Sequence, residues 1–312
     1  MEQSDHKCEA ELSSSWSCLR SGDLAGSYQI LNDCLLTHFD HPDVLTALKY
    51  VNFWREREKY LGDHRDVYTK IEYLLQQWPI FLEFQTRNPT NNEECNYGFR
   101  FYFFGTVNRM LDQILQKTDI LEPALQLRKG ICFKGMGDYD QAVQILEQAS
   151  LEKAEDPDII AQLADAYALV GETNLSKVFF REAFFIGPNE ISYVFLESEM
   201  IQRLFKAVQE KVGTDKLFLE WVPVYGELFR VFSVKRELRA VEYGRLRQSV
   251  YALERELANQ QVSDPTIMPR LLTKYFWIID HLISIHEEKS RIQEILLKIR
   301  SLNSEIHTLY TK

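Results

Sequence analysis

Apolar side chains recur at helical spacing through most of this chain. Between 97 and 117 they lie three or four residues apart, at Phe99, Phe103, Val107, Met110 and Ile114. The segment 234–261 has a similar stripe at Leu246, Val250, Leu253 and Leu257. Such spacing places the apolar positions on one face of an α-helix. The pattern therefore predicts an all-α protein, with the polar segment 85–96 as a loop between two helical blocks.

The C-terminal segment carries a second, seven-residue period. No Gly or Pro occurs from Arg270 to Lys312, and isoleucine recurs at 278, 285, 292, 299 and 306. A continuous helix from Pro265 would be roughly 70 Å long, against roughly 42 Å for the helix 234–261. Either this helix breaks near 287–290 and folds back, or its seam packs against another part of the chain or a second copy. The seam residues that could support a homodimer are Ile292, Ile295, Ile299, Leu302, Ile306 and Leu309.

Two segments in the middle of the chain repeat the same pattern at a distance of 34 residues. Gly137 and Gly171 mark the turn in each copy, where a positive φ is tolerated. Small residues pair at 130 and 164, 142 and 176, and 149 and 183, and bulky residues pair at 133 and 167 and at 146 and 180. Pro188 follows the second copy. A fixed period of this kind is typical of stacked helical hairpins.

These two copies, at about 121–190, resemble tetratricopeptide repeats. The resemblance implies a helical-repeat solenoid whose first helices line a groove for a partner peptide or helix. The groove residues that it implies are Leu127, Arg128, Ile131, Lys134, Asp158, Gln162 and Asp165. Members that bind a partner's C-terminal carboxylate have Lys and Asn where this chain has Leu127 and Ile131, so that clamp is missing. The alternative is that the protein's own flanking helices cover this face.

The N-terminal part has weaker copies of the same pattern. Gly22 is followed by Ser27, Leu31 and Cys34, and Gly62 is followed by apolar positions up to Pro79 at the closing position. We therefore expect degenerate repeat-like hairpins at 1–88 and a repeat domain at 97–190. A C-terminal helical region at 191–312 follows, with long helices and a heptad pattern at its end.

Composition narrows the function classes. The chain has 312 residues, 45% of them hydrophobic, and a net charge of −10, which disfavours nucleic acid as a partner. No apolar run is long enough for a transmembrane segment, and the charged N-terminus is unlike a secretory signal. Five irregularly spaced cysteines without a CxxC favour a reducing cytoplasm. A chain that had lost a signal peptide and gained a new Met would look the same.

Motifs that carry chemistry are missing from the sequence. It has no phosphate loop, no GxSxG, no HExxH and no GxGxxG. Cys34 and His38 lie one turn apart, with Asp40 and His41 nearby, but Cys34 also fits a packing position and His41 precedes Pro42 in an ordinary loop. We therefore expect neither a metal nor a cofactor.

The sequence favours a non-enzymatic adaptor or scaffold that binds a peptide or amphipathic helix of a partner protein. One alternative is a container for a small apolar ligand, since aromatic clusters occur along the chain. A third is a helical enzyme, which predicts a cluster of titratable side chains in one pocket.

Overall fold

The fold is all-helical, as the sequence predicted. The computed structural model describes residues 2–63, 66–116, 122–215, 217–234, 237–259 and 264–312. Within these ranges the chain forms α-helices α1 to α15 and two short 3₁₀ helices, with no strand. None of the described helices combines the length and apolar character that a membrane span requires.

The chain divides into two compact units, Met1–Ile145 and Leu146–Lys312. The boundary between the two units falls inside α7 (Tyr139–Glu152). The division into 1–88, 97–190 and 191–312 stays a prediction from the sequence.

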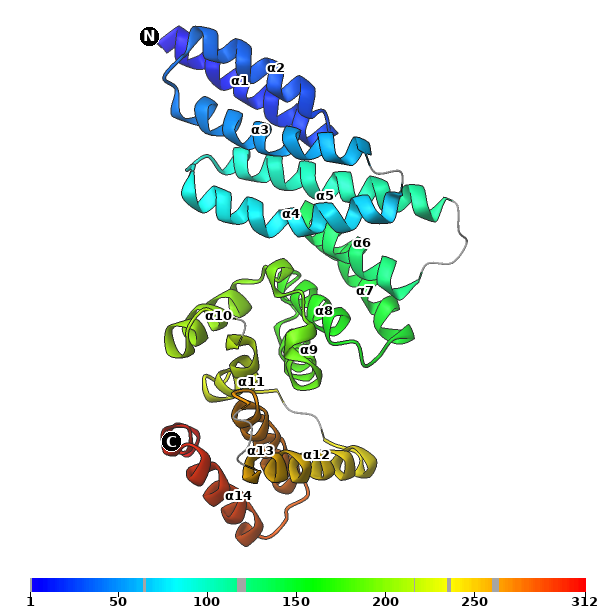
Figure 1. The fold of residues 1–312 in the computed structure, drawn as a ribbon, viewed down its shortest axis with the longest axis vertical. Helices are drawn as coiled ribbons and strands as arrows, with labels where there is room; N and C mark the ends of the chain where they lie inside the picture. Colours follow the sequence, from blue (N-terminus) through cyan, green and yellow to red (C-terminus); the bar gives the residue numbers. More distant parts are fainter. Residues whose placement is uncertain (1, 64–65, 117–121, 216, 235–236, 260–263) are drawn as a thin grey trace. The chain divides into compact units, whose positions relative to one another are not determined.

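The first unit is a stack of helices (Figure 1), and its core is rich in aromatic side chains. Its helices are α1 (Glu2–Ser21), α2 (Leu24–Thr37), α3 (Pro42–Asp63), α4 (Val67–Arg87), α5 (Glu93–Leu115) and α6 (Pro123–Met136). Helix α1 packs on α2 and α5, and α5 also packs on α4 and α6. Rings from α3, α4 and α5 fill the interior: the ring centroids of Trp78 and Phe103 are 4.6 Å apart, and those of Tyr50 and Phe81 are 5.3 Å apart. Aromatic pairs at such distances add to the stability of a core.

Of the turn and closing residues predicted in this unit, Gly22 lies at a turn, whereas Gly62 and Pro79 do not. Gly22 has φ 87°, and the Asp23 carboxylate accepts the Gly26 N–H at 2.7 Å, so the predicted turn before α2 is confirmed. Gly62 instead lies inside α3, and Pro79 lies inside α4 rather than closing a hairpin. Buried Trp78 and Phe81 flank Pro79, and this packing keeps the helix intact although proline removes one backbone hydrogen bond. The loop before α5 is also shorter than predicted.

The second unit begins with the end of α7 and a close helix pair (Figure 1). Its other elements are α8 (Pro157–Leu169), α9 (Thr173–Ile186), η1 (Pro188–Glu190), η2 (Tyr193–Phe195), α10 (Glu199–Val212), α11 (Phe218–Leu228), α12 (Ala240–Ala258), α13 (Ile267–Ser284), α14 (Lys289–Leu302) and α15 (Ser304–Tyr310). Gly171, with φ 89°, joins α8 to α9, and Gly137, with φ 85°, follows α6, so both predicted turns are confirmed. Ala164 and Ala183 are fully buried, as the repeat pattern requires.

The C-terminal segment is not one long helix. Helix α13 ends at Ser284, and α14 begins at Lys289, which confirms the predicted break near 287–290. His286 at this break has φ 54°. At the second break, the Asn303 side chain accepts the N–H groups of Glu305 and Ile306, both at 3.0 Å, and caps α15.

The isoleucine seam packs within the second unit, which is one of the arrangements that the sequence left open. Ile299 and Ile306 belong to the core of this unit, with 0% and 2% of their surface exposed. Ile292, Ile295 and Leu302 are half-buried and pack against the same core, whereas Leu309 is 39% exposed. Because the helix breaks twice, the seven-residue period no longer follows one helix face.

Candidate functional site

The predicted groove face of α8 is covered by the chain itself. The Asp165 carboxylate accepts the backbone N–H groups of Glu197 and Ser198, both at 2.8 Å. Gln162 donates to Asp158 at 3.1 Å and to the Ser192 carbonyl at 3.2 Å. Gln162 and Asp165 are fully buried. The segment 192–198 of the same chain therefore covers the predicted groove face of α8.

The predicted groove residues of α6 are also engaged within their own unit. Arg128 forms an ion pair with Glu72 of α4 and donates to the Ala124 carbonyl at 3.1 Å. Ile131 and Lys134 are buried, and Leu127 is half-buried. Arg100 of α5 donates to the backbone carbonyl of Lys134 at 3.1 Å. These residues act in packing, and none of them forms an exposed apolar groove floor.

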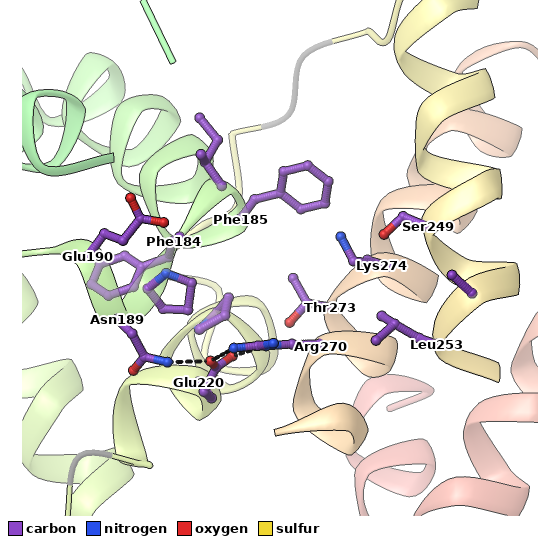
Figure 2. Close-up of a pocket in the computed structure, with 15 residues that line it drawn as sticks. Phe184, Phe185, Asn189, Glu190, Glu220, Ser249, Leu253, Arg270, Thr273 and Lys274 are labelled. Atoms are coloured by element: carbon purple, nitrogen blue, oxygen red, sulfur yellow. Dashed lines mark hydrogen bonds and ion pairs between the residues drawn. The ribbon is translucent and has the colours of Figure 1, made fainter. Parts of the chain in front are cut away.

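A pocket in the second unit is a stronger candidate for binding (Figure 2). It has a volume of about 420 Å³ and lies between the end of α9, η1, α11, α12 and α13. Apolar walls come from Phe184, Phe185, Pro223 and Leu253. Polar groups come from Ser249, Thr273, Glu190 and a charged cluster. Concave sites with apolar walls and a few convergent polar groups are the usual form of ligand sites.

The charged cluster is built around Glu220 of α11, of which 1% of the side chain is exposed. Arg270 of α13 approaches this carboxylate with two nitrogens: Nε donates to Oε2 at 3.0 Å, and Nη2 donates to Oε1. Asn189 of η1 donates to the same Oε1 at 2.5 Å (Figure 2). The Glu220 carboxylate, in turn, raises the pKa of Arg270. A buried carboxylate requires compensation of this kind, so Arg270 and Asn189 are committed to Glu220.

Lys274 lies one turn after Arg270 and lines the pocket. Its Nζ is 4.8 Å from the centroid of the Phe185 ring. Within the described residues, no carboxylate lies within ion-pair distance of this ammonium. Burial lowers the pKa of Lys274, the nearby Arg270 lowers it further, and Glu220 partly opposes the shift. The pocket therefore presents a cation that lacks a counter-ion in the described chain.

The sequence analysis missed this pocket. The local signal was a pair of cations at 270 and 274 on a helix that is otherwise mostly apolar. Glu220 and Asn189 are 50 and 81 positions away from Arg270, and no local pattern links residues at such separations.

Comparisons with protein-family models, with curated proteins and with solved structures find no match to this chain. The candidate site therefore rests on its own geometry.

Proposed function

We propose that this protein is a non-enzymatic adaptor whose second unit binds a carboxylate of a partner protein in the Lys274 pocket. The observation that carries this proposal is the half-buried Lys274 ammonium, which faces the pocket beside an already saturated Glu220–Arg270 pair. A bound carboxylate would supply the counter-ion, and a charge-assisted hydrogen bond in a partly dry site is stronger than one in water.

The apolar walls of the pocket indicate which chemical groups should lie next to the bound carboxylate. Phe185 and Leu253 border the position of the ammonium, so an apolar group next to the carboxylate would bury surface against them. A Glu or Asp side chain with a neighbouring Leu in a partner segment has this combination. The resemblance to tetratricopeptide repeats remains part of the proposal, with α8 and α9 as scaffold rather than as an open groove.

The test uses two peptides that differ in one group, acetyl-Leu-Ser-Glu-Ser-Leu-amide and its Gln counterpart. We expect the full-length chain to bind the Glu peptide at least about tenfold more tightly in calorimetry, because one charge-assisted contact contributes 1.4 kcal/mol or more. Lys274→Gln should remove this preference. Lys206→Gln, at an exposed position of α10, is the matched control and should retain it. Equal binding of the two peptides, or a preference that survives Lys274→Gln, contradicts the proposal.

A second candidate function follows from the position of Lys274, whose amine lines a pocket of about 420 Å³ one turn after the cationic Arg270. Burial, and to a smaller extent Arg270, lowers the pKa of this amine. A lysine that is desolvated beside another cation can act as a nucleophilic amine toward a carbonyl compound. The amine would add to the carbonyl carbon and lose water to form an imine, which borohydride reduces to a stable secondary amine. Incubation with pyruvate and borohydride, followed by mass spectrometry of the 267–284 peptide, tests this reaction. An unmodified Lys274 rejects it.

A further inference from the structure

Cys8 of α1, Cys34 of α2 and His38, the residue that follows α2, lie close together in the first unit. The two Sγ atoms are 3.3 Å apart, and Cys34 Sγ is 3.9 Å from His38 Nδ1. The three candidate ligand atoms all lie within 4.8 Å of one another. Both cysteines are completely buried, and His38 is half-buried at the end of α2. The sequence pattern grouped Cys34 and His38 with His41 and Asp40; packing of α1 against α2 brings in Cys8 instead.

These spacings suit a tetrahedral metal. Zinc binds thiolate sulfur at about 2.3 Å and imidazole nitrogen at about 2.0 Å, which places two sulfurs about 3.8 Å apart and a sulfur and a nitrogen about 3.5 Å apart. The distances of 3.3 Å and 3.9 Å differ from these by about half an ångström or less, and the third separation is within 4.8 Å. His38 Nδ1 also lies 2.9 Å from Thr37 Oγ1, a hydrogen bond that a metal at this nitrogen would replace. Side-chain rotations would therefore have to bring the three ligand atoms to one ion. His38 directly follows α2, and its backbone N–H donates to the Cys34 carbonyl at 2.8 Å, which keeps the two residues close together.

Glu11 lies outside this cluster of three ligand atoms and is the carboxylate that we consider for the fourth position. It lies on α1 one turn after Cys8, and its Oε2 atom is buried without a hydrogen-bond partner. Its other oxygen, Oε1, is 3.8 Å from Lys7 Nζ. A buried carboxylate oxygen without a partner is costly, and a metal ion would satisfy it.

We propose that Cys8, Cys34 and His38, with Glu11 as the fourth ligand, bind one zinc ion between α1 and α2. Two thiolates and a carboxylate balance the two charges of zinc and leave one negative charge beside Lys7. The set contains sulfur and nitrogen donors, which favour zinc over calcium or magnesium. The ion would connect the two helices of the N-terminal hairpin, so its role is structural.

The experiment uses the full-length chain, stripped with a chelator and kept in a thiol-free reductant, with Co²⁺ as the spectroscopic probe. We expect one Co²⁺ per chain, a thiolate-to-cobalt charge-transfer band, the strong visible bands of a tetrahedral site, and displacement by Zn²⁺. Cys8→Ser and Cys34→Ser should each weaken binding at least about a hundredfold, because loss of a ligand exceeds the effect of losing a supporting contact. Cys18→Ser is the matched control, since Cys18 also lies on α1 and is half-buried, and it should bind as wild type does.

Two further variants guard against loss of folding. Glu11→Gln should weaken binding about tenfold, since an amide is a poorer ligand than a carboxylate. His38→Ala changes a half-buried side chain at a helix end, and it should reduce the affinity while circular dichroism stays that of wild type. Zn²⁺ should also raise the Tm of wild type and of Cys18→Ser but leave that of Cys8→Ser unchanged.

Two outcomes would contradict the zinc site. A missing charge-transfer band in the wild-type chain, or Co²⁺ binding that survives both Cys8→Ser and Cys34→Ser, would show that no such site exists. A chain that binds no Co²⁺ under reductant but forms a Cys8–Cys34 disulfide in air would be a redox pair instead, and the zinc proposal would fail.

Discussion

Arg181 supports a sharp prediction, because it is buried between two carboxylates in the second unit. Its Nε lies 3.5 Å from Glu227 Oε2, its Nη2 is paired with Asp280, and its guanidinium carbon lies 4.2 Å from the centroid of the Trp277 ring. The side chains of Arg181, Glu227 and Asp280 are 5%, 9% and 7% exposed. Arg181→Met keeps much of the volume but removes the cation that pairs with both buried carboxylates.

We expect this substitution to lower the free energy of unfolding by about 3–5 kcal/mol, the usual cost of removing one partner from a buried ion pair. Most of that cost arises because the buried carboxylates of Glu227 and Asp280 lose an ion-pair partner, rather than because packing contacts are lost. Arg181→Met combined with Glu227→Gln and Asp280→Asn should therefore recover at least about half of the loss.

Urea denaturation of the full-length chain measures the change, and hydrogen exchange of peptides from α9 and α13 assigns it to the second unit. Arg203→Met is the matched control, because the Arg203–Glu199 pair is 76% exposed on both sides and should matter by less than about 1 kcal/mol. The reasoning is refuted if Arg181→Met stays within about 1 kcal/mol of wild type, or if the triple variant is no more stable than the single one.

Ala183→Arg should unfold the α8–α9 pair, because a fully buried alanine leaves no space for a long charged side chain; a wild-type melting curve in circular dichroism would contradict this. Asp165→Ala should cost about 3 kcal/mol or more in urea denaturation, since two buried backbone N–H groups lose their carboxylate acceptor, and a cost below about 1 kcal/mol would oppose this account. Ile299→Glu with Ile306→Glu should lower the Tm, while light scattering of the wild type gives a monomer near 36.7 kDa; dissociation of a dimer without destabilisation would restore the seam as an interface. The pKa of Lys274 is lowered in the folded chain from its ordinary 10.5, so the unfolded chain binds more protons between the two values, and the free energy of unfolding should rise with pH through that window. Lys274→Met should flatten this rise in urea denaturation series from neutral to alkaline pH.

The sequence predicted features that depend on neighbouring residues. The turns at Gly22, Gly137 and Gly171 all have a positive φ, a conformation that glycine adopts at little cost, so their positions were readable from the chain. The break after α13 was harder to place, because His286 takes a positive φ without glycine or proline. The heptad period of isoleucines continues across that break, so only the excess length of a continuous helix indicated it, as one of two alternatives.

The remaining features depend on residues far apart in sequence. Nothing in the sequence pairs Cys8 with Cys34, since their contact follows from how α1 packs on α2. Backbone N–H groups near 197 and 198 bind Asp165, and a backbone group leaves no signature in the identity of its residue. Predicting such a site requires knowledge of the tertiary structure, whereas helices and glycine turns can be predicted from neighbouring residues alone.

The segment that covers α8 has a consequence for competition by outside molecules. Glu197 and Ser198 are held by Asp165 and belong to the same chain, so their effective concentration at that face is about millimolar or higher. A free peptide present at about one micromolar would have to bind the face roughly a thousandfold more tightly than this segment does in order to displace half of it. Tethering therefore protects the face of α8 against most short peptides, even those whose intrinsic affinity equals that of the chain's own segment.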